Sequence, residues 1–149
     1  MIVVLNQNQW LKLVQSDWYQ PIVSQIKDFQ QFCCTNYDLI LAYQLDDKIV
    51  GFITIIKLVD HYEIIWLLVH SEYQNQKIGT KLVQALIQFV QTINSTTKNN
   101  YSIWLEVATS NQYAVCLYQK QKFKINRLRK KYFNNQQDAW EMVWNQEKS

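Results

Sequence analysis

WLLVHSEYQNQKIGTKL, residues 66–82, is the stretch that decides the fold. It runs from a continuous apolar segment through a polar loop into residues whose apolar positions recur every three or four places. This change of period predicts a strand, a loop and then a helix that begins near Gly79. The first amide groups of a helix have no acceptor within it, so this helix end can bind a phosphate. Gly79 also has a purely structural explanation, since a lone glycine often eases a loop into a helix.

The segments on either side of this stretch predict a single mixed domain over residues 1–149. Upstream, residues 39–45, 49–59 and 62–69 predict three strands joined by short turns, which is typical of an antiparallel meander. The remaining elements expected are a strand at 2–5, helices at 9–14 and 21–32, a strand at 101–107, a helix at 111–121, and strands at 123–132 and 138–144 joined by a turn at Asn134–Asn135. This order is typical of an α+β or mixed α/β domain.

The composition excludes several classes of protein. The only glycines, Gly51 and Gly79, are too few for a G-x-G-x-x-G fingerprint and too far apart for a Walker P-loop. There is no apolar run long enough to span a membrane and no signal-peptide pattern. The odd number of cysteines, without a C-x-x-C pair, predicts a cytoplasmic location. Three cysteines and two histidines without ligand spacing predict neither a disulfide framework nor a metal site. A net charge of +3 is too small to indicate nucleic-acid binding.

A second informative stretch is IWLEVATSNQYAVCLY, residues 103–118. Glu106 is the one charged residue in an apolar strand, where a carboxylate is costly unless it is paired or protonated. It is therefore a candidate general base, with a structural carboxylate paired to a cation as the alternative. Tyr118 lies about two turns into the following helix, where it could equally be a half-buried core aromatic. Ser110 or Asn111 can cap that helix.

These stretches also carry a family resemblance. EYQNQKIGTKLV, residues 72–83, resembles the acetyl-CoA pyrophosphate loop Q/R-x-x-G-x-G/A of the GCN5-related N-acetyltransferase (GNAT) family. LEVATSNQYAVCLYQKQKF, residues 105–123, resembles L-E-V-R-x-S-N-x-x-A-x-x-L-Y-x-x-x-G-F of the branch that acetylates the N-terminal alanine of a ribosomal protein. RKKYFNNQQDAWEMVW, residues 129–144, is similar to its R-x-x-Y-Y turn followed by D-A-x-x-M. The resemblance extends from about Asp38 to Trp144.

The resemblance implies the GNAT fold, with a central, mostly antiparallel sheet flanked by helices, and acetyl-CoA as co-substrate. It implies direct transfer in a ternary complex, with Glu106 as base and Tyr118 as the acid that protonates the departing CoA thiolate. The cofactor-binding positions that it implies are Leu67, Leu68, Val69, Asn75, Gln76, Lys77, Ile78, Gly79, Thr80 and Asn111. The implied partner is a protein N-terminus, that of a small-subunit ribosomal protein, bound by a monomer or weak dimer without direct nucleic-acid or membrane contact.

Some positions depart from the family pattern. Lys77 replaces the first glycine of the loop, Ala108 an arginine, Lys122 the glycine before a phenylalanine, and residues 70–72 an aspartate–proline turn. Lys77 is strained if its φ is positive and tolerable if it is helical.

Three alternatives to the protein N-terminus stay open. One is a small-molecule acceptor, such as a polyamine, an antibiotic or a metabolite amine. Another is a CoA-binding interaction domain without catalysis, which the joint presence of Glu106, Tyr118 and Asn111 disfavours. The third is a nucleic-acid patch formed by the basic run of residues 120–131, although alternation along a strand favours a solvated face.

Overall fold

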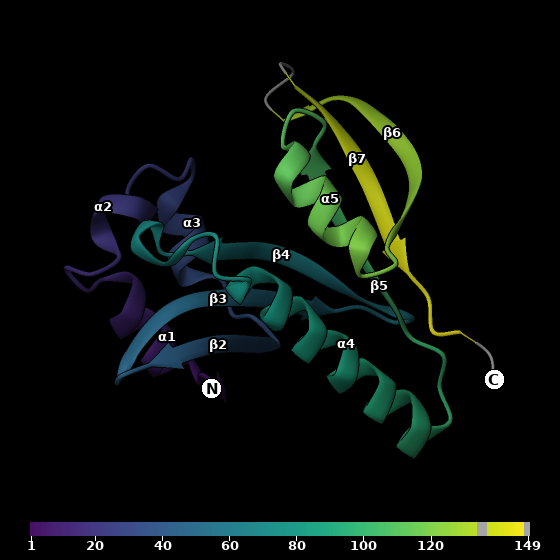
Figure 1. Ribbon diagram of the computed structural model, residues 1–149, viewed down its shortest axis with the longest axis horizontal. Helices are drawn as coiled ribbons and strands as arrows, with labels where there is room; N and C mark the ends of the chain where they lie inside the picture. The colour runs from purple at the N-terminus through teal and green to yellow at the C-terminus, as the bar shows by residue number, and fades with distance from the viewer. Residues whose placement is uncertain (134–136, 148–149) are drawn as a thin grey trace. The chain divides into compact units, whose positions relative to one another are not determined.

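The computed structural model describes residues 1–133 and 137–147, which form a mixed α/β fold (Figure 1). The strands are β1 (Ile2–Val4), β2 (Leu39–Leu45), β3 (Lys48–Lys57), β4 (His61–Val69), β5 (Ser102–Ala108), β6 (Lys124–Phe133) and β7 (Gln137–Trp144). The helices are α1 (Gln7–Val14), α2 (Gln20–Val23), α3 (Phe29–Cys34), the 3-10 helix η1 (Ser71–Tyr73), α4 (Ile78–Thr97) and α5 (Gln112–Lys120). The turn predicted at Asn134–Asn135 lies outside the described residues.

The strands are hydrogen-bonded in the order β1-β2-β3-β4-β5-β7-β6. The pairs β1–β2, β2–β3, β5–β7 and β6–β7 are antiparallel. The exception is β4–β5, which is parallel over three residue pairs, His61–Glu63 with Ser102–Trp104. These pairings confirm the predicted mixed fold with a mostly antiparallel sheet.

The chain divides into two compact units, and the long elements β3, β4 and α4 contribute residues to both. Unit 1 consists of Met1–Ile55 and Trp66–Leu82, and unit 2 of Ile56–Ile65 and Val83–Ser149. The expectation of one domain over residues 1–149 stays a prediction.

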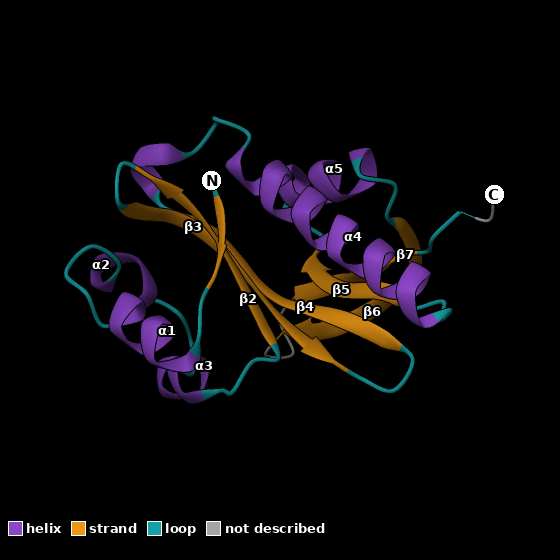
Figure 2. Ribbon diagram, turned by 90° about the horizontal axis from the view of Figure 1, so that it is seen from below, coloured by secondary structure: helices purple, strands orange, loops and turns teal. Residues whose placement is uncertain are grey.

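Unit 1 is built around aromatic side chains. Trp10 of α1 is fully buried and makes edge contacts with Phe32, Tyr37 and Phe52 at centroid distances of 4.9–5.6 Å. Its indole N–H donates to the Cys33 carbonyl at 3.1 Å, so its polar group is satisfied. Figure 2 shows α1, α2 and α3 grouped on one side of β2 and β3.

The predicted helix at 21–32 is wrong as a single element. Helix α2 ends at Val23, and α3 begins only at Phe29. Asp28, immediately before α3, has φ 57°, which is left-handed backbone that an α-helix cannot contain. The chain therefore turns between two short helices, and Phe32 enters the core from the second of them.

Unit 2 shows the alternation expected of a strand with one buried face. Along β5, Ile103, Leu105 and Val107 are buried, while the intervening side chains face a more polar side. Helix α4 ends at Thr97, and Asn94 in its last turn exchanges two hydrogen bonds with the backbone of Tyr101. None of the helices in the described part of the chain is long and apolar enough to span a membrane.

Candidate active site

Unit 1 contains the end of β4 that was expected to contact the cofactor. Leu67, Leu68 and Val69 are half-buried and close the strand. The next residue, His70, holds this strand end against β3, because its backbone N–H donates to the Val50 carbonyl at 2.8 Å. The His70 ring stacks on Trp18 with 3.7 Å between centroids, and its Nε2 lies 2.9 Å from the Trp18 carbonyl. A carbonyl can only accept, so Nε2 carries the proton.

The loop after β4 leads into the N-terminus of α4. Asn75 and Lys77 have left-handed φ values of 65° and 62°, with exposed Gln76 between them. The first helical hydrogen bond of α4 runs from the Lys81 N–H to the Lys77 carbonyl. The backbone N–H groups of Ile78, Gly79 and Thr80 therefore come before it in the chain. Amides that precede the first helical bond, at the positive end of a 20-residue helix, suit a phosphate. The loop therefore fits the pyrophosphate role that the resemblance implied.

Lys77 has the positive φ for which backbone strain was expected. Its φ is positive, so its Cβ carries the steric cost of left-handed backbone that the glycine of the family pattern avoids. Lys122, the other lysine at a family glycine, has φ 72°. Gly79, by contrast, has no positive φ and is buried in the first turn of α4.

Gly51 of β3 lets α4 approach the sheet closely. A Cβ at this position would lie 3.1 Å from Ile78 Cγ2, 3.2 Å from the Leu68 carbonyl and 3.3 Å from Leu82 Cδ1. The missing side chain at Gly51 thus brings the first turn of α4 against the strand end that carries Leu68.

Unit 2 contains both proposed catalytic side chains. Glu106 lies on the polar side of β5 with 13% of its side chain exposed. Its Oε1 accepts a hydrogen bond from Arg129 Nη1 of β6 and forms an ion pair with it. Its Oε2 is buried and has no hydrogen-bond partner among the described residues. The ion pair is what the structural alternative predicted, and the unpartnered oxygen is what a base needs.

Two further glutamates share this side of unit 2, and sequence reasoning missed both. Glu141 of β7 lies opposite Glu106 in the ladder and is 5% exposed. Glu63 of β4 lies opposite Trp104, two residues before Glu106, so alternation puts it on the same face. Burial, and after it the charges of Glu106 and Glu141, raise the pKa of the Glu63 carboxyl. The described residues include no group of three His, Cys, Asp or Glu side chains suited to holding a metal ion.

Tyr118 is fixed by the way α5 ends. Lys122 in left-handed backbone directs its N–H to the Gln119 carbonyl and the Phe123 N–H to the Tyr118 carbonyl, each at 3.0 Å. This is a Schellman motif, and its accompanying apolar contact is the Tyr118–Phe123 ring pair at 5.4 Å. Burial raises the pKa of the Tyr118 phenol, so the side chain keeps its proton at neutral pH. At the other end of α5, Asn111 Oδ1 caps the helix by accepting from the Ala114 N–H at 3.2 Å.

The mixed fold described above is the one expected of the GNAT class. The family model described as "Acetyltransferase (GNAT) family" matches residues 7–123. The chain belongs to this family.

Individual proteins resemble this chain in sequence or in fold. An N-alpha-acetyltransferase of Saccharolobus solfataricus is 33% identical over 89 residues, which are 58% of this chain and 49% of that protein. The match therefore spans about half the length of this relative. The ribosomal-protein-S18-alanine N-acetyltransferase of Escherichia coli has the same fold, with a TM-score of 0.82, 20% identity, and coverage of 100% of this chain and 95% of that one. Arabidopsis thaliana NAA60, solved with acetyl-CoA, gives a TM-score of 0.73 at 17% identity, covering 97% of each chain.

Proposed function

We propose that this chain transfers the acetyl group of acetyl-CoA to the N-terminal α-amine of a protein, with an N-terminal alanine of a small-subunit ribosomal protein as the leading acceptor. The observation that carries the proposal is the state of Glu106 in a chain of the GNAT family: its Oε2 is buried and has no hydrogen-bond partner among the residues that the structure describes. A relative named N-alpha-acetyltransferase supports the choice of an α-amine, and the E. coli ribosomal-protein enzyme suggests the acceptor.

The cofactor part of the proposal belongs to unit 1. Bound acetyl-CoA supplies a thioester, which is an activated acyl group. The backbone amides of Ile78, Gly79 and Thr80 would hold its pyrophosphate, and the Lys77 ammonium adds a positive charge beside them. The backbone of Leu67–Val69 would contact its pantetheine and acetyl portion. The family resemblance implies a further contact with the cofactor for Asn111 of unit 2.

Glu106 would act as the base. An α-amine has a solution pKa of about 7.7–8.0, so much of it is protonated at neutral pH and must lose a proton before it can attack. Glu106 Oε2 takes that proton, directly or through one water: the N–H bond breaks, an O–H bond forms, and the electron pair stays on nitrogen. The ion pair with Arg129 occupies only Oε1, so it leaves this role open.

Tyr118 would act as the acid. A group that protonates a departing thiolate must itself hold a proton at the start of the reaction, and burial keeps the Tyr118 phenol in that form. The Schellman motif and Phe123 fix the direction from which the side chain leaves α5. Precise placement of this kind is what makes proton transfer by a side chain effective.

One observation favours a second acceptor class. Glu63, Glu106 and Glu141 put three carboxylates on one face of unit 2, which suits a multiply charged amine such as a polyamine. Arg127 and Arg129 pair with two of these carboxylates, which lowers the net negative charge of the face. The α-amine of a protein therefore remains the leading proposal.

The release of free CoA thiol tests this function. The protein is incubated with acetyl-CoA and a panel of acceptors: peptides that begin with alanine, the same peptides with a blocked N-terminus, and spermidine. The proposal predicts thiol release with free alanine termini alone. Release with spermidine alone would establish the second acceptor class. Failure to bind acetyl-CoA would overturn both.

A further inference from the structure

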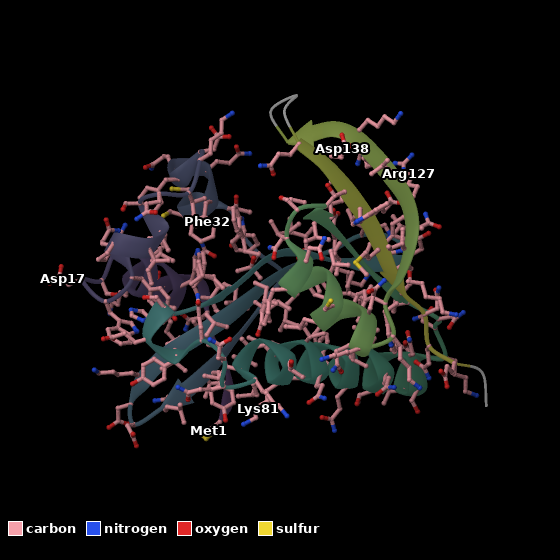
Figure 3. All side chains as sticks on the ribbon, turned by 45° about the horizontal axis from the view of Figure 1, so that its top comes forward. Met1, Asp17, Phe32, Lys81, Arg127 and Asp138 are labelled. Atoms are coloured by element: carbon pink, nitrogen blue, oxygen red, sulfur yellow. The ribbon has the colours of Figure 1, made fainter. Side chains whose placement is uncertain are left out.

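Five charged side chains from four neighbouring strands share the polar face of unit 2. We call them the Glu106 cluster: Glu63 of β4, Glu106 of β5, Glu141 of β7, and Arg127 and Arg129 of β6. The ladder register aligns them, because Glu106 lies opposite Glu141 and Glu141 lies opposite Arg127. Arg127 is seen on the curved strand β6 in Figure 3.

Each arginine of the cluster forms an ion pair with a different carboxylate. Glu141 has both oxygens held, by Asn126 Nδ2 at 2.7 Å and by Arg127 Nε at 3.2 Å. Arg129 bonds to Oε1 of Glu106, whereas Oε2 of Glu106 has no partner in the described part of the chain. One carboxylate is thus fully held, and the other is held at one oxygen only.

We propose that Arg129 is a positioning residue for Glu106: its guanidinium fixes Oε1 and thereby aims Oε2 at the acceptor amine. This inference rests on the proposed function. A buried carboxylate oxygen without a partner is costly, so its orientation persists only where another contact holds the group. A planar guanidinium does this better than a flexible ammonium, because its donors have a fixed geometry. The proton that leaves the amine nitrogen then bonds to Oε2, while Oε1 stays paired.

Arg129 also sets the charge around the base. The groups that face Glu106 are Glu63 and His61 from β4, Glu141 from β7, and Arg127 and Arg129 from β6. Without Arg129, Glu106 would face two other carboxylates, and the other arginine of the cluster, Arg127, is already bonded to Glu141. An opposite charge in direct contact favours the ionised carboxylate, so its removal favours protonation.

Arg129→Gln, Arg129→Lys and the control Arg127→Gln test the inference through the pH dependence of kcat/KM on an alanine-terminated peptide. Arg129→Gln should move the acid limb of the profile to higher pH and lower kcat with little change in the KM for acetyl-CoA. Arg129→Lys should restore the position of the limb while kcat stays below that of the parent. Arg127→Gln should move the limb less than Arg129→Gln does, because Arg127 pairs with Glu141 and not with Glu106.

The outcomes separate this inference from the proposed function. Circular dichroism melting first establishes that each variant is folded at the assay temperature. An active parent whose acid limb does not move in folded Arg129→Gln overturns the positioning role alone. Equal movement of the limb in Arg127→Gln also overturns it, since a general change of charge would then explain the effect. A parent that acetylates no α-amine overturns the proposed function and this inference together.

Discussion

Glu106 on β5 and Glu141 on β7 lie directly opposite each other in an antiparallel pair of strands. Like charges in such a pair repel, so two facing glutamates should destabilise the ladder. Strand β6 offsets the repulsion by supplying a separate cation to each, Arg129 to Glu106 and Arg127 to Glu141. The negative charge on the face that carries the proposed base is therefore balanced by two arginines of β6, a strand that follows β5 only after α5.

Glu106→Gln should lower turnover by about 10²–10⁴-fold, the usual contribution of a positioned general base. The loss should be greatest at acidic pH, where more of the acceptor amine is protonated and needs a base. Initial rates of thiol release between pH 6 and 9 measure this. Glu147→Gln is the matched control, because that carboxylate is 80% exposed and pairs with the exposed Lys122. A variant at Glu106 as active as this control at every pH would refute the assignment.

Tyr118→Phe should slow product formation while acetyl-CoA still binds, because the change removes only the hydroxyl and keeps the ring that packs on Phe123. Since burial raises the pKa of the phenol, the parent should show no loss of activity from this group as the pH rises to 10. Calorimetric titration with CoA and steady-state kinetics measure the two effects. An unchanged kcat, or a loss of CoA binding that accounts for the whole defect, contradicts the role as acid.

Lys77→Gly should stabilise the protein. Left-handed backbone costs a residue with a Cβ roughly 1–2 kcal/mol, and glycine's greater freedom in the unfolded chain costs roughly 0.5–1 kcal/mol in return. A net gain of about 0.5–1 kcal/mol is expected, measured by denaturant unfolding. Lys77→Ala keeps the Cβ and should show no such gain, although both variants lose the same positive charge beside the proposed phosphate site. Equal stability of the two variants would show that backbone strain is absent.

Glu63→Gln should alter how stability depends on pH. The pKa of Glu63 is raised in the folded state, so the folded form binds the proton more tightly than the unfolded form does. Its contribution is full below about pH 4.5 and is lost as the pH rises through the raised pKa. The variant should therefore unfold at a higher temperature than the parent at pH 7. The gain in the free energy of unfolding should be less than about 1 kcal/mol, because water screens the charge. The difference should vanish near pH 4, and a larger difference there than at pH 7 would reverse the argument.

Much of the fold could be predicted because period and turn chemistry are local. The apolar runs of β2–β4 and the helical spacing of α4 identified those elements. The roles of Glu106 and Tyr118 as base and acid came from the family resemblance of residues 105–123 and stay predictions. The partner of Glu106 could not be read in this way. Arg129 is 23 residues away, and the β6–β7 register shifts between Ile125 and Arg127, so pairing depends on an irregularity in the ladder. The break at Asp28 was equally hidden, because a left-handed aspartate has no unique sequence signal.

The central claim is that the acceptor is the α-amine of a protein N-terminus, and the site of acetylation tests it most directly. A peptide with an N-terminal alanine and an internal lysine is incubated with acetyl-CoA at pH 7, and tandem mass spectrometry locates the acetyl group. The ordinary pKa of lysine, about 10.4, leaves its amine more protonated than the α-amine at this pH. We predict one acetyl group on the alanine nitrogen, with one CoA thiol released for each. Acetylation confined to the lysine, or an unmodified peptide beside acetylated spermidine, would contradict the account.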